Sequence, residues 1–161
     1  MIDEMEVVRH FKSAAPVDVV RAIEALGISY FEKNMAPEQS GYFKNTGKGY
    51  EIGVNIKDGL QRKRFTAAHE LGHFILHRDM LGVGEHFDRL YGASASRNPN
   101  APFSPRHEVQ ANQFAADFLM PAGLVKYLFS MSNHDTSALA ERFLVSRASA
   151  EIRLKNLGIL P

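Results

Sequence analysis

The stretch that decides the fold of this chain is Arg64-Phe65-Thr66-Ala67-Ala68-His69-Glu70-Leu71-Gly72-His73-Phe74-Ile75-Leu76-His77. Residues 60–77 contain no proline and a single glycine, so we predict one continuous helix. At about 100° per residue the apolar side chains fall on one side and the histidines on the side next to it. One face of the helix therefore packs into a core, and the neighbouring face carries the chemistry.

The polar face holds a His-Glu-x-x-His motif, a pattern typical of zinc peptidases. His69 and His73 lie one helical turn apart, with Cβ atoms about 5–6 Å from each other. Both imidazoles can therefore reach one ion at roughly 2.0–2.1 Å. Glu70 lies beside them, about 100° from His69, where it can accept a proton from a water on the ion. The alternative is a surface helix with two incidental histidines.

A zinc site needs a third protein ligand besides the two histidines. His77 continues the stripe, but it lies about 12 Å along the helix axis from His69, too far for one ion to bind all three histidines. We expect His77 beside the ligands or at the helix end. The chain has no cysteine, so the third ligand must come from a histidine or an acid elsewhere.

The best candidate for the third ligand is Glu108, in a second predicted helix over residues 105–120 that Ser104 caps. Glu108 falls within the apolar face of that helix, and a buried carboxylate is costly unless it is paired or bound to a metal. It could instead pair with Arg62 or Arg64, or favour the helix dipole as a first-turn acid. The rival ligands are His107, His86, Glu85 and Asp79.

Two runs of this sequence resemble known motifs. The first quoted run is similar to the active-site helix of the ImmA/IrrE family of zinc metallopeptidases. Glu108-Val109-Gln110-Ala111-Asn112-Gln113-Phe114-Ala115-Ala116-Asp117-Phe118-Leu119-Met120-Pro121 resembles the second motif of that family. By this resemblance His69, His73 and Glu108 match zinc ligands, and Glu70 matches the catalytic acid/base. Asn112 also matches a family position.

The resemblance implies a zinc-dependent endopeptidase with one zinc ion and a zincin-like fold. It also implies that the chain cleaves or otherwise inactivates a helix-turn-helix repressor or antitoxin-like regulator of a phage, a mobile element or a stress response. The alternative is a DNA-binding or protein-binding regulator that has a zinc site but no protease activity. Histidine and carboxylate ligands are not strictly selective, so another divalent ion could replace zinc in the cell.

Length and composition fit one small enzyme domain, residues 1–161. The 161 residues suffice for one core, and 45% apolar and 23% charged residues are ordinary for a globular protein. A net charge of +1 gives no global indication of nucleic-acid binding. The acidic N-terminus does not resemble a signal peptide, and no apolar run is long enough to span a bilayer, so we expect a cytoplasmic protein without a membrane partner. Nothing in the sequence specifies an oligomeric state.

The remaining patterns predict an α+β fold in which a small three-stranded sheet packs on the active-site helix. Helices are expected near residues 3–12 and 16–27, and strands near 29–33, 41–45 and 50–56, the last two joined by a turn. The C-terminal half is mostly helical, with helices near 121–129, 137–143 and 147–156. An exposed strand edge could hold an extended peptide, or the sheet could merely cover the helices.

Residues 131–161 resemble a helix-turn-helix, in which Arg147, Arg153 and Lys155 could contact phosphates. Leu144 stands where such turns often carry glycine, and positive charges are few, so simple helical packing is the alternative.

For three further features the sequence allows more than one interpretation. Residues 82–102 are rich in glycine, serine, asparagine and proline, and we hypothesise a mobile lid there, with a plain linker as the alternative. The basic cluster at residues 62–64 could attract an acidic peptide, pair with nearby acids or remain solvated. The candidates for an oxyanion stabiliser are Tyr91, His86, Arg106 and Tyr127.

Overall fold

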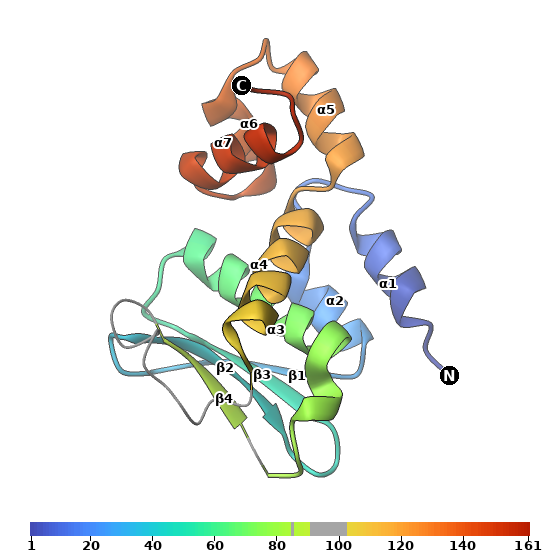
Figure 1. Ribbon diagram of the computed structural model, residues 1–161, viewed down its shortest axis with the longest axis vertical. Helices are drawn as coiled ribbons and strands as arrows, with labels where there is room; N and C mark the ends of the chain where they lie inside the picture. The colour runs from blue at the N-terminus through green and yellow to red at the C-terminus, as the bar shows by residue number, and fades with distance from the viewer. Residues whose placement is uncertain (85, 91–102) are drawn as a thin grey trace.

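Helix α3 (Leu60–His77) lies at the centre of the fold in the computed structural model, which describes residues 1–84, 86–90 and 103–161. One side of α3 contacts strands β2 and β3, and another side packs along helix α4 (Pro105–Leu119). The helix spans the predicted residues, and its buried positions include both motif histidines. Helix α3 is thus enclosed between a sheet and a second helix (Figure 1).

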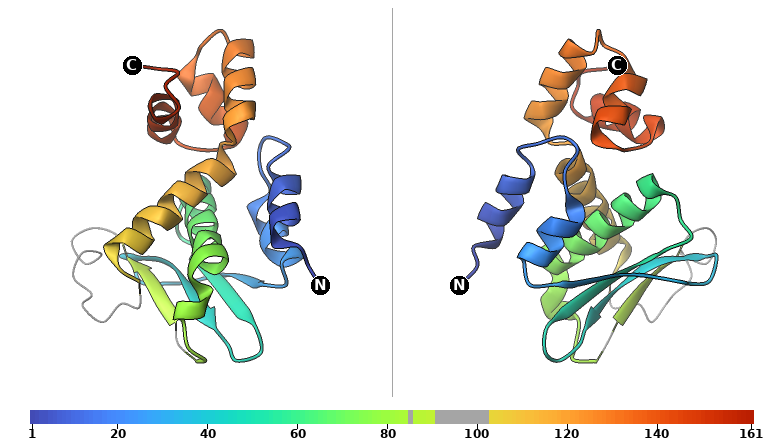
Figure 2. Two further views of the ribbon diagram at one scale, coloured as in Figure 1. Left: turned by 45° about the vertical axis from the view of Figure 1, so that its right-hand side comes forward. Right: turned by 180° about the vertical axis from the view of Figure 1, so that it is seen from behind.

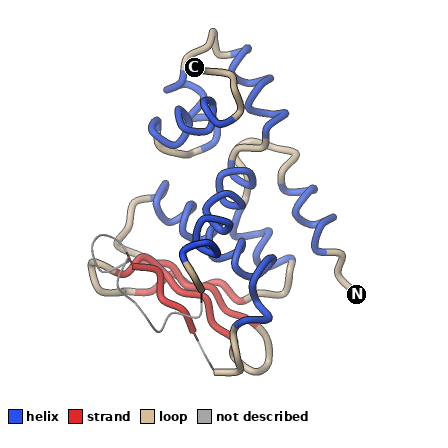
Figure 3. Tube along the Cα trace, in the orientation of Figure 1, coloured by secondary structure: helices blue, strands red, loops and turns tan. Residues whose placement is uncertain are grey.

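The sheet has four strands in the order β1-β3-β2-β4. The three predicted strands are present as β1 (Ser29–Lys33), β2 (Gln39–Asn45) and β3 (Tyr50–Asn55). The pair β1 and β3 is parallel, and β2 runs antiparallel to β3 through the predicted turn, where Asn45 pairs with Tyr50. The sheet packs on α3 as expected, and the overall class is α+β (Figure 3).

The expectation of only three strands was wrong, because β4 (His86–Leu90) adds a fourth. It pairs antiparallel with the edge of β2 that β3 leaves open, and Tyr42 is opposite Asp88. Five residues between glycine-rich segments carry a weak strand pattern, and the pairing depends on an edge that the local sequence does not reveal. Within the hypothesised lid, residue 85 and residues 91–102 lie outside the described residues.

The two N-terminal helices, α1 (Glu4–Phe11) and α2 (Val19–Ala25), begin at aspartate caps. Asp3 accepts hydrogen bonds from the backbone of Met5 and Glu6, and Asp18 accepts one from Arg21. Helix α2 therefore begins after Asp18 rather than at Pro16 as predicted, because an aspartate in an extended conformation satisfies the first amides of the helix.

The C-terminal helices α5 (Ala122–Met131), α6 (Thr136–Phe143) and α7 (Arg147–Asn156) gather beyond the end of α4, as two further views show (Figure 2). Leu144 ends α6 in the left-handed conformation with φ 53° and ψ 48°. The buried side chains of these helices and of the turn between α6 and α7 belong to the same hydrophobic cluster as those of the sheet and α3: Val125, Leu128, Phe129, Leu139, Ala140, Phe143, Val145, Ala150 and Leu154.

Polar contacts also link the C-terminal helices to the rest of the chain. Arg153 of α7 donates from Nε to the Met120 carbonyl at 3.0 Å and pairs with Asp117 of α4 at 3.1 Å. Arg64, at the start of α3, donates to the Phe143 carbonyl at the end of α6 at 3.2 Å. Arg64 of the predicted basic cluster and Arg153 of the predicted DNA-contacting segment thus each join separate elements of the fold.

Among the described residues, no single helix is long and apolar enough to cross a membrane, although α4 and α5 together, bent by 48°, reach that length and composition.

Candidate metal centre

The close packing of α3 against α4 brings the two predicted motifs together. Gly72 lies at the crossing, where an added Cβ would stand 3.1 Å from the Phe114 Cβ and 3.2 Å from the Ala111 carbonyl oxygen. The absence of a side chain at Gly72 therefore allows α4 to approach α3 closely at this point. The histidines on α3 face the first turns of α4 as a result.

Glu108 is held in the first turn of α4 by a reciprocal cap. The Ser104 side chain accepts from the His107 amide at 3.4 Å, and the Ser104 amide donates to Nδ1 of His107 at 2.9 Å. Pro105 occupies the first turn, where its missing amide hydrogen costs nothing. This cap fixes the helix start and with it the direction of Glu108, and it engages Nδ1 of the rival ligand His107.

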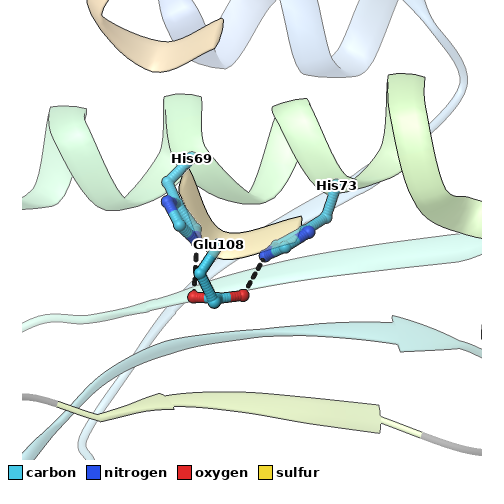
Figure 4. Close-up of side chains that lie close together, drawn as sticks. All are labelled: His69, His73 and Glu108. Carbon is cyan, nitrogen blue, oxygen red and sulfur yellow. Dashed lines mark ion pairs between the residues drawn. The ribbon is translucent and has the colours of Figure 1, made fainter. Parts of the chain in front are cut away.

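The carboxylate of Glu108 lies between the two imidazoles (Figure 4). Its Oε2 is 3.2 Å from Nε2 of His69, and its Oε1 is 2.7 Å from Nε2 of His73. One ligand atom from each residue lies within 4.8 Å of the others. Both histidine side chains have no exposed surface, whereas the Glu108 side chain is 29% exposed, so the cluster opens towards solvent on the glutamate side.

The electrostatics of the cluster favour neutral imidazoles and an ionised carboxylate. Burial lowers the pKa of His69 to about 4 and also lowers the pKa of His73, although Glu108 opposes both shifts. Burial alone would raise the pKa of Glu108, but the contacts with His69 and His73 outweigh it and hold that pKa below its usual range. Neutral histidine and ionised glutamate are the forms that bind metal ions.

The outer nitrogens of both histidines have partners. Nδ1 of His69 lies 2.7 Å from Oδ1 of Asn112, and Nδ1 of His73 lies 3.0 Å from Nδ1 of His77. Oxygen accepts, so the His69 ring carries its proton on Nδ1 and turns the lone pair of Nε2 towards Glu108. The motif match alone did not show what Asn112 does. Its contact with the His69 ring becomes visible only when α4 is placed beside α3.

This geometry fits a cation. A neutral His69 with its proton on Nδ1 presents a lone pair to a negatively charged oxygen 3.2 Å away, and two acceptors at that distance need a positive species between them. Two imidazole nitrogens and a carboxylate oxygen are a common donor set of zinc sites that keep one position open. His69, His73 and Glu108 would hold the ion.

Two other charged residues lie in or near the cluster. Glu70 has no exposed surface and follows His69 directly on α3, as the motif predicts. Arg89 of β4 places Nη1 4.0 Å from Oε2 of Glu108, and its guanidinium lies over the Phe65 ring at 5.6 Å from the ring centroid. Arg62 and Arg64 were the partners of Glu108 expected from the sequence, whereas Arg89 was not expected and could have been found only by recognising β4 as a strand.

Of the remaining predicted site residues that the structure describes, none joins His69, His73 and Glu108 in the group of possible metal ligands. Arg106 is exposed, and Tyr127 on α5 is 60% exposed. Asp79 belongs to a short 3-10 helix, Arg78–Met80, and takes no part in the group of possible metal ligands found among the described residues. Glu85 and Tyr91 lie outside the described residues, and for His86 the structure describes the backbone in β4.

The fold and the His-His-Glu cluster define a metallopeptidase-type protein. The family model of the IrrE N-terminal-like domain, Peptidase_M78, matches residues 23–155. The chain therefore belongs to this family, and the resemblance noted in the sequence is confirmed. No curated protein matches the chain closely enough to count as a relative.

A solved structure of similar fold is described as a Mycobacterium tuberculosis transcriptional regulator. It is 17% identical to this chain and superposes with a TM-score of 0.62 over 94% of this chain and 46% of that one. The chain thus spans less than half the length of that protein. At this identity the likeness shows a common fold.

Proposed function

We propose that this chain is a zinc-dependent endopeptidase that acts on a protein substrate. The observation that carries the proposal is the convergence of His69, His73 and Glu108 from two helices around one point, with both imidazoles buried. An ordinary salt bridge at a protein surface joins exposed charged side chains. Two neutral, fully buried histidines beside one carboxylate are not needed for such a pair, so this arrangement favours a metal site. Membership of a peptidase family supports the same reading.

In this proposal each residue of the cluster has one task. His69, His73 and Glu108 hold the ion, and Asn112 fixes the ring orientation of His69. Zinc, when bound, supplies a Lewis acid that polarises a peptide carbonyl and a water molecule. Glu70 takes the proton from the attacking water and delivers it to the nitrogen of the departing amine. The Glu70 side chain is buried, so bulk water is excluded from its carboxylate.

We further propose that Arg89 stabilises the negative charge that develops on the carbonyl oxygen of the substrate. The Arg89 side chain is 13% exposed and comes from β4, an edge strand of the described sheet. The guanidinium makes a cation–π contact with the Phe65 ring. A fixed cation in a partly dry site is worth far more than one in water, because it needs no reorganisation during the reaction.

We propose a helix-turn-helix repressor or an antitoxin-like regulator as the substrate. The resemblance to ImmA/IrrE proteins supports this target, and so does the name of the similar solved structure, a transcriptional regulator. A cytoplasmic location would follow from such a target.

The test is cleavage by the zinc-loaded chain and by its Glu70→Gln variant. A proteome-derived peptide library and purified helix-turn-helix repressors serve as substrates, and mass spectrometry reads the cut sites. The variant should bind zinc as the parent does but lose activity by at least about 10²-fold, because it lacks the proton acceptor. Glu24→Gln on the exposed face of α2 is the matched control and should cleave normally. Equal cleavage by both variants would refute the role of Glu70.

DNA binding by α6 and α7 is the second candidate function, favoured by their helix–turn–helix order. Two contacts weaken it. Arg153 is 13% exposed and is held by Asp117 and the Met120 carbonyl, and Lys155 pairs with Glu151 at 3.2 Å. Salt-dependent binding to duplex DNA that is lost in Arg147→Ala would favour this function over proteolysis.

A further inference from the structure

A line of hydrogen-bonding groups runs from His73 away from the cluster of possible metal ligands. Nδ1 of His73 lies 3.0 Å from Nδ1 of His77, and Nε2 of His77 lies 2.8 Å from Oε1 of Gln110 on α4. His77 is 6% exposed and His73 has no exposed surface, so the contact between the two rings lies away from bulk water. The His73 ring is also stacked on Phe103, with centroids 4.1 Å apart and planes at 10°, which restrains its rotation.

The direction of the hydrogen bonds follows from the last group in the line. The Gln110 oxygen is an acceptor, so Nε2 of His77 must donate to it. A neutral His77 that donates from Nε2 has a lone pair on Nδ1, and this lone pair accepts from Nδ1 of His73. His73 then carries its proton on Nδ1 and leaves the lone pair of Nε2 on the side of Glu108.

We propose that His77 and Gln110 are positioning residues that fix His73 in the tautomer able to bind a metal ion. The inference rests on the proposed metal site but concerns residues outside it. A metal-binding histidine commonly donates its other nitrogen to a carboxylate or a carbonyl oxygen. His69 does so in one step through Asn112, whereas His73 reaches its amide acceptor in two steps through a second imidazole.

The opposite direction of these hydrogen bonds shows why the atom that Gln110 presents to His77 matters. A donor in place of the Gln110 oxygen would turn His77 round, so that Nδ1 of His77 donates and Nδ1 of His73 accepts. The proton of His73 would then sit on Nε2, the atom that faces Glu108, and block the metal position. The identity of one atom on α4 thus decides whether His73 can act as a ligand.

The test combines zinc affinity with a direct reading of the tautomer in the metal-free protein. Competition with a chelator gives the zinc dissociation constant, and two-bond proton–nitrogen correlation spectra of ¹⁵N-histidine-labelled protein locate the ring protons. His77→Phe keeps an aromatic ring but removes the acceptor, and Gln110→Lys replaces an acceptor with a donor. Gln110→Glu keeps an acceptor at the same place. Gln113→Lys adds the same charge at an exposed position of α4 as a control.

The proposal predicts that the unaltered chain has the His73 proton on Nδ1. It predicts that His77→Phe and Gln110→Lys shift this proton towards Nε2 and weaken zinc binding by about 10- to 100-fold. Gln110→Glu and Gln113→Lys should retain both properties. Gln110 is only partly buried, so its variants should fold even if His77→Phe does not.

An unchanged His73 tautomer in Gln110→Lys would overturn the proposal, even if zinc binding weakened, because the residue would then act by packing or charge alone. Failure of the unaltered chain to bind zinc would instead refute the proposed function. The tautomer spectra, recorded without metal, would still decide whether His77 and Gln110 orient His73.

Discussion

Replacing Gly72 by alanine should push α3 and α4 apart at the point where they bring the ligands together. The new methyl group would meet Cβ and Cδ1 of Phe114 at 3.1 Å and the carbonyl oxygen of Ala111 at 3.2 Å. Ordinary carbon–carbon contacts are about 3.5–4.0 Å, so α4 must move by roughly half an ångström. The Phe114 Cβ and the Ala111 oxygen are part of the α4 framework and cannot yield by a side-chain rotation alone.

Two opposing contributions set the size of the effect. Overpacking of this kind costs about 1–3 kcal/mol, whereas alanine is better than glycine inside a helix by about 1 kcal/mol. The free energy of unfolding should therefore fall by about 1 kcal/mol, which lowers Tm by about 2–4 °C in a chain of this length. Zinc binding should weaken as well, because Glu108 moves with α4 while His69 and His73 stay on α3.

Thermal unfolding and chelator competition measure these two effects. Gly123→Ala is the matched control, because this glycine lies in α5 and nothing stands within 4 Å of an added Cβ. The control should gain up to about 1 kcal/mol and bind zinc unchanged. A Gly72→Ala protein that is as stable as Gly123→Ala, with unaltered zinc affinity, would refute the argument that close helix packing builds the site.

Three further predictions concern acid stability, catalysis and the turn after α6. In the metal-free protein the free energy of unfolding should fall by about 3 kcal/mol as the pH drops from 6.5 to about 4, because buried His69 resists a proton that the unfolded chain accepts. The pKa of His73 is also lowered and acts in the same direction, and urea unfolding against pH would show the slope reduced in His69→Gln. Arg89→Met should lower kcat by about 10²–10³-fold with zinc bound as before, in steady-state peptide cleavage. Leu144→Gly should raise the free energy of unfolding by up to about 1 kcal/mol, because φ at this position is 53°.

For each of these three predictions one result would contradict it. A metal-free protein equally stable at pH 6.5 and pH 4 would show that His69 is not held neutral by burial. Full activity of Arg89→Met would remove Arg89 from the reaction. A loss of stability in Leu144→Gly would mean that the contacts of the half-buried leucine outweigh the backbone conformation.

Local patterns were sufficient for most of the fold. The apolar spacing around the motif gave α3 its full length, and Ser104 marked the start of α4. Alternation predicted β1, β2 and β3 to within a few residues. Strand β4 could not be predicted, because five residues beside glycine-rich segments become a strand only when the open edge of β2 is present.

Some residues of the candidate site could likewise be predicted from the sequence, and others could not. Glu108 could be placed from the sequence because an acid within an apolar helical face demands a partner. Asn112, Gln110 and Arg89 could not be assigned, because their contacts depend on the crossing of α3 and α4 and on the position of β4. His77 was expected near the ligands by its spacing, but its partners on either side come from tertiary structure.

The central claim, one ion held by two imidazoles and one acid, is tested most directly by zinc K-edge X-ray absorption on the zinc-loaded chain. The account predicts one zinc per chain with two histidine nitrogens in its first coordination sphere. It predicts one histidine fewer in His73→Gln and loss of tightly bound zinc in Glu108→Gln. A chain that retains no zinc, or a spectrum that Glu108→Gln leaves unchanged, would contradict it.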